Sequence, residues 1–410
     1  MKPTPRHIQT VYLTLLLLNT LAASFIWGVN TLFLLDAGLN NTQAFLANAF
    51  FTIGQVIFEV PTGIIADLKG RRTSYLLGTF VLALTTLMYL GIWYIHGPMW
   101  MWAISSILLG LGFTFFSGAT EAWLVDALEF AGFKGNLEEV FGKGQMIGGG
   151  AMLVGAVGGG FIAQMTNLSI PYLLRAFLLL ITFGVAFVYM HDWGFERGKS
   201  VDIIGDTKKL FTSSFQFGWS RPPIRWLMIS APFVSGVSFY AFYAMQPYLL
   251  QLYGDSTAYG VAGLAAAIVA LSQVAGGFGV RYVKKYFKSR TTVLIISGII
   301  SILALILVGM TESFALAIIL LSIWGLISSL AQPVRQAYLN SLIPSKQRAT
   351  VLSFDSLVSS SGGVFIQPIL GKVADVANYS LSFLIGAIFQ ALSIPFLFLV
   401  KEKKSEADKL

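Results

Sequence analysis

Long apolar segments recur along the whole chain and restrict what it can fold into. Segments 11–35, 44–65, 75–95 and 381–400 each hold about twenty apolar or small residues, and a helix of that length crosses the roughly 30 Å hydrocarbon layer of a membrane. The chain is 56% hydrophobic and only 11% charged, whereas soluble proteins average about 25% charged residues. It therefore cannot bury its apolar surface in a single globular core.

The count of these segments predicts the architecture. We find eight more, at 99–119, 146–163, 172–190, 226–252, 261–280, 293–310, 314–330 and 351–369. Their apolar residues do not alternate with polar ones, which predicts helices and argues against a membrane barrel. We expect an all-α membrane protein with 12 transmembrane helices.

Basic residues indicate how these helices are oriented. If the amino terminus is inside, only Arg175 and Lys372 of the 27 Lys and Arg residues fall toward the outside. The positive-inside rule then predicts a multi-pass protein of the inner or plasma membrane with both termini in the cytoplasm. The basic clusters are expected to contact anionic membrane lipids, and no nucleic-acid motif accompanies them.

The composition also excludes several kinds of chemistry. The chain has no Cys, and its three His residues are scattered, so neither disulfides nor a metal site is expected. We find no nucleophile motif and no phosphate-binding loop, which argues against an enzyme, against ATP as the energy source and against any cofactor. The first apolar segment is too long for a cleavable signal peptide.

A polar stretch divides the chain into two sets of six helices. We expect an N-terminal bundle at 1–190, a cytoplasmic linker at 191–224, and a C-terminal bundle with a short tail at 225–410. Apolar residues alternate with charges over 203–215, as in a short helix lying on the membrane surface, although a plain tether is the simpler interpretation.

An internal repeat supports this division. Gly63 and Asp67 have counterparts at Gly277 and Arg281, and at nearly the same offset the segment 121–124 matches 336–339. Two matches that share one offset, both at equivalent helix ends, predict two pseudo-symmetric bundles formed by duplication.

The most informative motif is the turn GIIADLKGRR at 63–72. Gly70 allows a positive backbone angle that ends a helix, and Gly63 is expected to let another helix approach closely. Asp67 can face the positive end of a neighbouring helix, while Arg71 and Arg72 can reach acids on nearby helix ends. A simpler interpretation is that the basic residues only fix the topology.

This turn resembles the loop signature between the second and third helices of the major facilitator superfamily of transporters. The resemblance implies two bundles that alternate between inward-open and outward-open states, with the turn acting as a cytoplasmic latch. For that latch we expect Asp126 to be the partner of Arg71 or Arg72.

Further segments resemble the drug:proton antiporter subgroup. They are PTG after Glu59 and SGATEAW at 117–123, while IPSKQRATVLS at 343–353 resembles the superfamily's loop before the eleventh helix. Two features depart from that subgroup: Ala156 stands where a glycine-rich signature has proline, and segment 99–118 lacks the Arg of many proton-coupled members. Proton coupling would then depend on Glu59 and Glu121.

Four charged residues are expected inside the membrane. Each such charge costs about 2.5 to 3.5 kcal/mol, so Glu59, Glu121, Arg335 and Asp355 imply either pairing or function. A carboxyl group there can bind and release a proton, or can belong to a permanent salt-bridge gate. For Glu59 and Glu121 both interpretations stay open, whereas for Arg335 and Asp355 we favour the gate.

Aromatic and amide residues are candidates for a substrate cavity. We expect a fraction of them to line it and the others to pack or face lipid. The candidates are Trp27, Asn30, Gln55, Tyr240, Tyr243, Gln246, Gln273 and Gln332. Such a cavity suits a small amphipathic organic molecule, organic cations included.

These features together predict a monomeric secondary transporter that exports a small organic compound in exchange for protons. Two alternatives stay open: a uniporter or symporter for a nutrient or lipid, and a membrane receptor or sensor built on a transporter scaffold.

Overall fold

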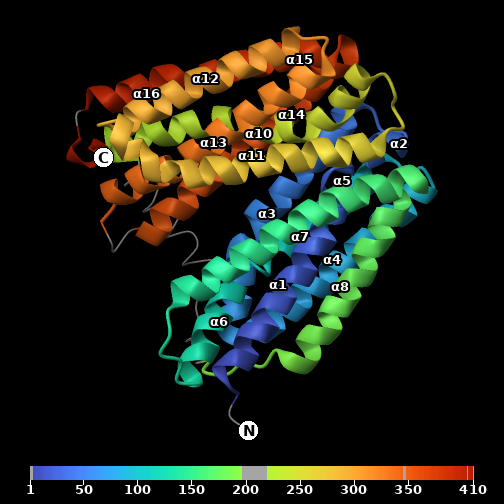
Figure 1. Ribbon diagram of the computed structural model, residues 1–410, viewed down its shortest axis with the longest axis vertical. Helices are drawn as coiled ribbons and strands as arrows, with labels where there is room; N and C mark the ends of the chain where they lie inside the picture. The colour runs from blue at the N-terminus through green and yellow to red at the C-terminus, as the bar shows by residue number, and fades with distance from the viewer. Residues whose placement is uncertain (1–2, 196–218, 345–347, 404, 410) are drawn as a thin grey trace. The chain divides into compact units, whose positions relative to one another are not determined.

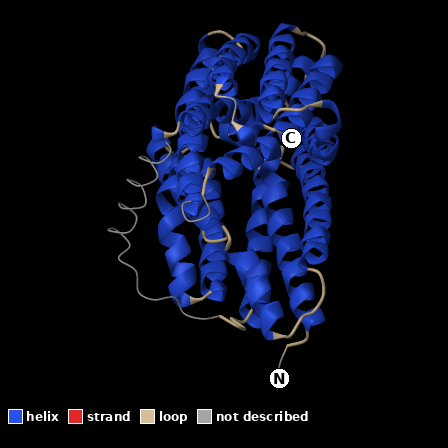
Figure 2. Cartoon of the chain, turned by 90° about the vertical axis from the view of Figure 1, so that its left-hand side faces the viewer, coloured by secondary structure: helices blue, strands red, loops and turns tan. Residues whose placement is uncertain are grey.

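The computed structural model describes residues 3–195, 219–344, 348–403 and 405–409. Helices dominate this part of the chain, and it contains no β-strand beyond one isolated bridge between Ser289 and Lys409 (Figure 2). The surface helix expected at 203–215 lies outside the described residues.

The first half of the chain forms eight helices in the described part (Figure 1). Their bounds are α1 Pro5–Trp27, α2 Asn30–Asp36, α3 Asn41–Lys69, α4 Arg71–Tyr94, α5 Met99–Thr114, α6 Ala119–Phe130, α7 Leu137–Met165 and α8 Ser169–Tyr189.

The second half contains seven described α-helices and a short 3₁₀ turn (Figure 1). Their bounds are α10 Pro222–Tyr253, α11 Tyr259–Tyr286, α12 Arg290–Met310, α13 Phe314–Leu342, α14 Arg348–Val376, α15 Tyr379–Ala391, α16 Ser393–Glu402 and η2 Glu406–Asp408.

Eleven stretches of the described residues are long and apolar enough to cross a membrane. Two of them, Met99–Phe130 and Tyr379–Glu402, each combine two consecutive helices, α5 with α6 and α15 with α16. The twelfth expected crossing is α14, which has sufficient length but carries Asp355, Lys372 and Asp375. The all-helical prediction is therefore confirmed, and eleven of the twelve expected crossings are candidate membrane spans among the described residues.

Large apolar side chains cover the outer faces of these helices. On α8, Leu173, Phe177, Leu180 and Phe187 are exposed, and Phe177 retains 61% of its accessible surface. Their spacing of three, four and seven residues places them along one side of the helix. An exposed apolar surface of this extent is suited to lipid rather than to water.

The two halves repeat the same helix pairings. In the first half α1 packs on α7 and α8, and α4 packs on α5 and α8. In the second half α10 packs on α14 and α16, and α12 packs on α13 and α15. Each pair in one half has its counterpart in the other, as expected for a duplicated six-helix unit.

Glycines allow the closest of these helix contacts. A Cβ atom at Gly159 of α7 would lie 1.9 Å from the carbonyl oxygen of Phe25 in α1. In the other half, a Cβ at Gly362 of α14 would lie 1.9 Å from the carbonyl oxygen of Pro232 in α10. The glycine-rich segment of α7 thus serves helix packing.

The chain divides into two compact units whose membership differs slightly from the expected bundles. Unit 1 is Met1–Gly38, Phe50–Ile203 and Thr257–Ala267. Unit 2 is Leu39–Ala49, Ile204–Ser256 and Ile268–Leu410. The first residues of α3 therefore belong to unit 2, and the first residues of α11 belong to unit 1.

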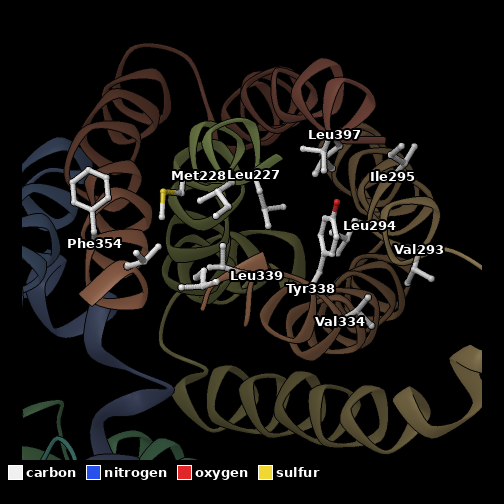
Figure 3. Close-up of a cluster of buried hydrophobic side chains, with 14 of the residues drawn as sticks. Leu227, Met228, Val293, Leu294, Ile295, Val334, Tyr338, Leu339, Phe354 and Leu397 are labelled. Atoms are coloured by element: carbon white, nitrogen blue, oxygen red, sulfur yellow. The ribbon is translucent and has the colours of Figure 1, made fainter. Parts of the chain in front are cut away.

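Unit 2 has an apolar core to which six helices contribute (Figure 3). Leu227 and Met228 of α10 belong to it with residues of α11, α12, α13, α14 and α16, including Tyr338 and Leu397. Tyr338 and Leu227 are fully buried there. This core fixes the helices that carry Arg335 and Asp355.

Candidate functional site

Helix α3 positions the first acidic candidate, Glu59. The carboxylate of Glu59 accepts a hydrogen bond of 2.5 Å from the Ser117 hydroxyl, and its side chain is exposed. Pro61 follows in the same helix and cannot donate a hydrogen bond to the carbonyl of Ile57, which weakens the helix next to Glu59. No ion pair in the described part of the chain involves Glu59.

The fourth crossing is broken beside Glu59. Helix α5 ends at Thr114 and α6 begins at Ala119, and Gly118 between them has the left-handed backbone angle φ of 66°. Ser117, the partner of Glu59, lies in this break. Interrupted membrane helices are tolerated where they are buried in protein or line water, and they are common at transport sites.

Glu121, the second acidic candidate, lies in the first turn of α6, just after the break. Its side chain is exposed, and none of the ion pairs between described residues involves it. Glu59 of α3 therefore contacts this helix break through Ser117, and Glu121 lies just after the break, both in unit 1. The sequence indicated both acids but neither the break nor Ser117.

Arg335 and Asp355 form a largely buried ion pair between α13 and α14. Arg335 Nη1 lies 2.8 Å from Asp355 Oδ2, and Nη2 lies 2.6 Å from Oδ1. Their side chains retain only 16% and 9% of their accessible surface. This two-bond geometry is the strong form of an arginine–carboxylate contact.

The turn at Gly70 has the backbone that its sequence predicts. Gly70 has φ of 101°, ends α3 and caps α4. Arg71 pairs with Asp67 at 2.6 Å within the turn. The Arg72 guanidinium donates a 2.6 Å hydrogen bond to the Phe187 carbonyl and lies over the Phe187 ring.

Two expectations about this turn differ from the structure. Asp126 forms no direct ion pair with Arg71 or Arg72 in the described part of the chain, where Arg71 pairs with Asp67 and Arg72 contacts Phe187, but the charge of Arg71 still acts on Asp126. A Cβ at Gly63 would meet no atom within 4 Å, so Gly63 is not a point of close helix contact. Gly54 is one, since its Cβ would lie 2.3 Å from the Ile107 carbonyl oxygen of α5.

Asp192, which no sequence pattern indicated, caps the start of α4. Its Oδ1 accepts a 2.7 Å hydrogen bond from the backbone N–H of Arg72. In unit 2 the equivalent position is taken by Asp408, whose Oδ1 accepts a 2.7 Å hydrogen bond from the N–H of Thr291 at the start of α12. The repeat thus extends to helix caps that no local pattern reveals.

The substrate candidates of unit 1 are partly accessible. Gln55 lies one turn before Glu59 on the same face of α3, and both Gln55 and Trp27 are half-buried. Asn30 accepts a 2.9 Å hydrogen bond from the Tyr172 hydroxyl, so its amide oxygen is engaged in holding α8 to the start of α2.

The candidates of unit 2 separate into buried and accessible residues. Tyr240 is fully buried and packs between Phe45 and Phe383, with ring centroids 4.8 and 5.8 Å away, and Gln246 is buried as well. Tyr243 and Gln273 are half-buried, and Gln332 is exposed. Tyr240 and Gln246 therefore belong to the packed core of the unit.

Arg175 is a buried charge that the sequence did not indicate as a functional candidate. It lies in α8, is 3% exposed, donates a 3.1 Å hydrogen bond from Nε to the Thr86 hydroxyl and faces the Phe113 ring. The distribution of basic residues places Arg175 toward the outside of the membrane, but its side chain is buried in the interior of unit 1.

The described helices form two repeated sets with eleven candidate membrane crossings, and two acids lie beside a broken crossing, an arrangement that fits a transporter. The family model described as Major Facilitator Superfamily matches residues 12–366 and 283–410. The chain belongs to this superfamily, and it is a transporter rather than an enzyme.

Relatives of known sequence agree with this assignment. The chain is 22% identical to the uncharacterized MFS-type transporter MJ1560 of Methanocaldococcus jannaschii over 90% of this chain and 92% of the relative. It is also 22% identical to the uncharacterized MFS-type transporter YxaM of Bacillus subtilis, over 98% of both chains.

Two solved structures share the fold. The nucleoside transporter NupG superposes with a TM-score of 0.78 at 12% identity, over 96% of this chain and 99% of that one. A bacterial homologue of the human lysosomal transporter Spinster gives 0.73 at 15% identity, over 100% and 99% of the two chains.

Proposed function

We propose that this transporter exports a small amphipathic organic compound in exchange for protons, with Glu59 and Glu121 as the coupling groups. The observation that carries this proposal is that both acids are exposed at one helix break and that neither forms an ion pair with a described residue. A carboxylate facing lipid is costly, so an exposed acid at membrane depth is best explained by contact with water.

Arg335 and Asp355 have a different role in this proposal. They form a closed, buried pair in which each charge already has its partner. Such a pair stabilises one arrangement of α13 and α14 and suits a gate element better than a group that releases protons freely.

The substrate chemistry follows from the accessible side chains. Gln55 and Glu59 offer an amide and a carboxylate on one face of α3, and Trp27, Tyr243, Gln273 and Gln332 add aromatic and amide groups. A carboxylate with aromatic rings suits an organic cation with an apolar body. We further propose a monomer in the inner or plasma membrane with both termini in the cytoplasm, on the basis of its basic loops.

Transport in liposomes tests the proposal. Purified protein is reconstituted, a pH gradient is imposed, and uptake of a panel of fluorescent lipophilic cations is followed together with internal pH. We expect at least one cation to accumulate against its gradient while protons move the opposite way. Movement of no cation and no protons, in vesicles where the protein is folded, would contradict the proposal, and cation flux insensitive to pH would favour a uniporter.

A further inference from the structure

A cavity of about 530 Å³ opens in unit 2, where α12 begins and α16 ends. Three segments form its wall: the turn before α12, the last turns of α16 and the tail that follows α16. The lining residues are Lys288, Ser289, Phe398, Lys401, Glu402, Ser405, Asp408 and Lys409. None of them belongs to the groups to which a role in transport is given above.

The cavity lies at the ends of two membrane helices. Helices α12 and α16 both belong to stretches that are long and apolar enough to cross a membrane, and they pack on each other. On α12, Ile296, Ile299 and Leu303 are exposed, and their spacing of three and four residues places them on one side of the helix. Phe398, on the cavity wall, keeps 48% of its accessible surface. The cavity therefore borders a lipid-facing surface at the level where the spans end, which is the level of lipid headgroups.

Hydrogen bonds hold the tail that forms one wall of the cavity. Asp408 Oδ1 accepts a 2.7 Å hydrogen bond from the N–H of Thr291, and Oδ2 accepts bonds of 2.8 and 2.7 Å from the hydroxyls of Thr291 and Ser289. An isolated β-bridge also joins Ser289 to Lys409. The backbone of Lys409 is thus fixed beside the start of α12, so the cavity exists without a ligand.

The three lysines of the cavity are available to an anion. Lys288 and Lys401 form no ion pair with any residue that the structure describes. Lys409 Nζ lies 2.6 Å from Glu406 Oε2, but the two side chains keep 73% and 85% of their accessible surface. An ion pair so exposed contributes little stability, so an incoming anion can compete with Glu406 for Lys409.

The other polar groups around the cavity are already engaged or exposed to water. Both oxygens of Asp408 accept hydrogen bonds, and Glu402 is exposed. The first amides of α12 are also used, since the N–H of Thr291 bonds to Asp408 and the N–H of Thr292 bonds to the Ser289 hydroxyl. An anion in the cavity must therefore be bound by the lysine ammonium groups rather than by the helix start.

We propose that this cavity binds the phosphate of an anionic phospholipid, whose acyl chains lie beside Phe398 and the exposed side of α12. Ammonium groups bind phosphate through charge and hydrogen bonds, and basic pockets at the ends of membrane helices are suited to anionic headgroups. The Phe398 ring and the methylene stems of the lysines add apolar surface, which a lipid uses and a free phosphate ion does not. This site does not depend on which substrate is carried or on proton coupling.

Native mass spectrometry of the full chain in detergent tests the site. Phosphatidylglycerol is titrated as the anionic lipid and phosphatidylcholine as the zwitterionic one, and inorganic phosphate is added as a competitor. We expect phosphatidylglycerol to bind more tightly than phosphatidylcholine and to resist displacement by excess phosphate. A photoactivatable phosphatidylglycerol is expected to crosslink within 286–290 or 398–409.

Substitutions that change one charge at a time locate the interaction. Lys288→Gln and Lys401→Gln should each weaken phosphatidylglycerol binding about fivefold, because each removes one of the charges near the headgroup. Glu406→Gln frees Lys409 and should tighten binding about twofold. Lys134→Gln, at an exposed lysine between α6 and α7, is the matched control and should leave the affinity unchanged.

Three results would overturn the site. Unchanged affinity in the Lys288→Gln, Lys401→Gln double variant would show that the lipid does not bind there, and an equal loss in Lys134→Gln would show attraction to overall charge only. Displacement of phosphatidylglycerol by phosphate at comparable concentration would show a site for the free ion rather than for a lipid. A gain in affinity in Glu406→Gln cannot come from partial unfolding, so it separates recognition of charge from damage to the fold.

Discussion

At the scale of single residues, the four charges that the sequence predicts inside the membrane differ in their partners. Arg335 and Asp355 satisfy each other in a buried pair, while Glu59 is hydrogen-bonded to a hydroxyl and Glu121 has no ion-pair partner among the described residues. The sequence placed all four at membrane depth but could not assign partners, because pairing depends on how α13 faces α14.

The first prediction concerns the buried pair. Removing one partner leaves an uncompensated buried charge, so Arg335→Gln and Asp355→Asn should each destabilise the protein by about 3 kcal/mol. The double variant Arg335→Gln, Asp355→Asn leaves no charge and should be more stable than either single variant. Thermal unfolding in detergent, followed by tryptophan fluorescence, gives the order of stability of the wild type, the single variants and the double variant.

If the two single variants unfold at the wild-type temperature, the pair contributes no stability and its role as a structural gate element is wrong. Glu138→Gln, at an exposed position in the first turn of α7, is the control for loss of a charge alone.

At the scale of secondary-structure elements, apolar length predicted the helices well. The start of α4 after Gly70, and the glycine packing of α7, follow from local sequence. The break between α5 and α6 did not, because the apolar pattern continues through it and only the positive φ of Gly118 interrupts the helix. Helix caps from Asp192, Asp375 and Asp408 were also missed, since each lies far along the chain from the helix it caps.

The Gly70 turn provides a prediction at this scale. An alanine there must adopt a positive φ, and its Cβ would lie 2.2 Å from Asp192 Oδ2, so the carboxylate that caps α4 must move. Gly70→Ala should therefore cost about 3 kcal/mol of stability, from backbone strain and loss of the cap. Gly132→Ala is a comparison for positive φ without a close neighbour, because Gly132 has φ of 72° and no atom within 4 Å of a Cβ, and it should cost about 1 kcal/mol.

Chemical or thermal unfolding of both glycine variants measures the difference. Equal losses for the two would show that Asp192 contributes nothing to the turn beyond the backbone strain.

At the scale of the whole molecule, two repeated sets of membrane helices make this chain a transporter of the major facilitator superfamily. The loop motif at 63–72 was sufficient to predict this from sequence. Which residues belong to which unit was less predictable. The first turns of α3 and α11 are assigned by their tertiary packing, and nothing in their sequence distinguishes them from the rest of each helix.

The substrate site is the least predictable part at this scale. Helical spacing identifies aromatic and amide residues as candidates for lining a substrate cavity. It cannot separate core residues such as Tyr240 from accessible ones such as Gln332. A buried aromatic residue and a cavity-lining one have the same helical period.

The most direct test of proton coupling compares pH-driven transport with exchange in the same liposomes. Glu59→Gln and Glu121→Gln are reconstituted beside wild type, with Glu138→Gln as the control, using a cation that wild type carries. The coupling group, once neutral, can no longer release a proton, so we predict that at least one variant loses pH-driven accumulation more than tenfold while retaining counterflow exchange. Unchanged pH dependence in both variants would contradict the central claim that these two acids couple transport to protons.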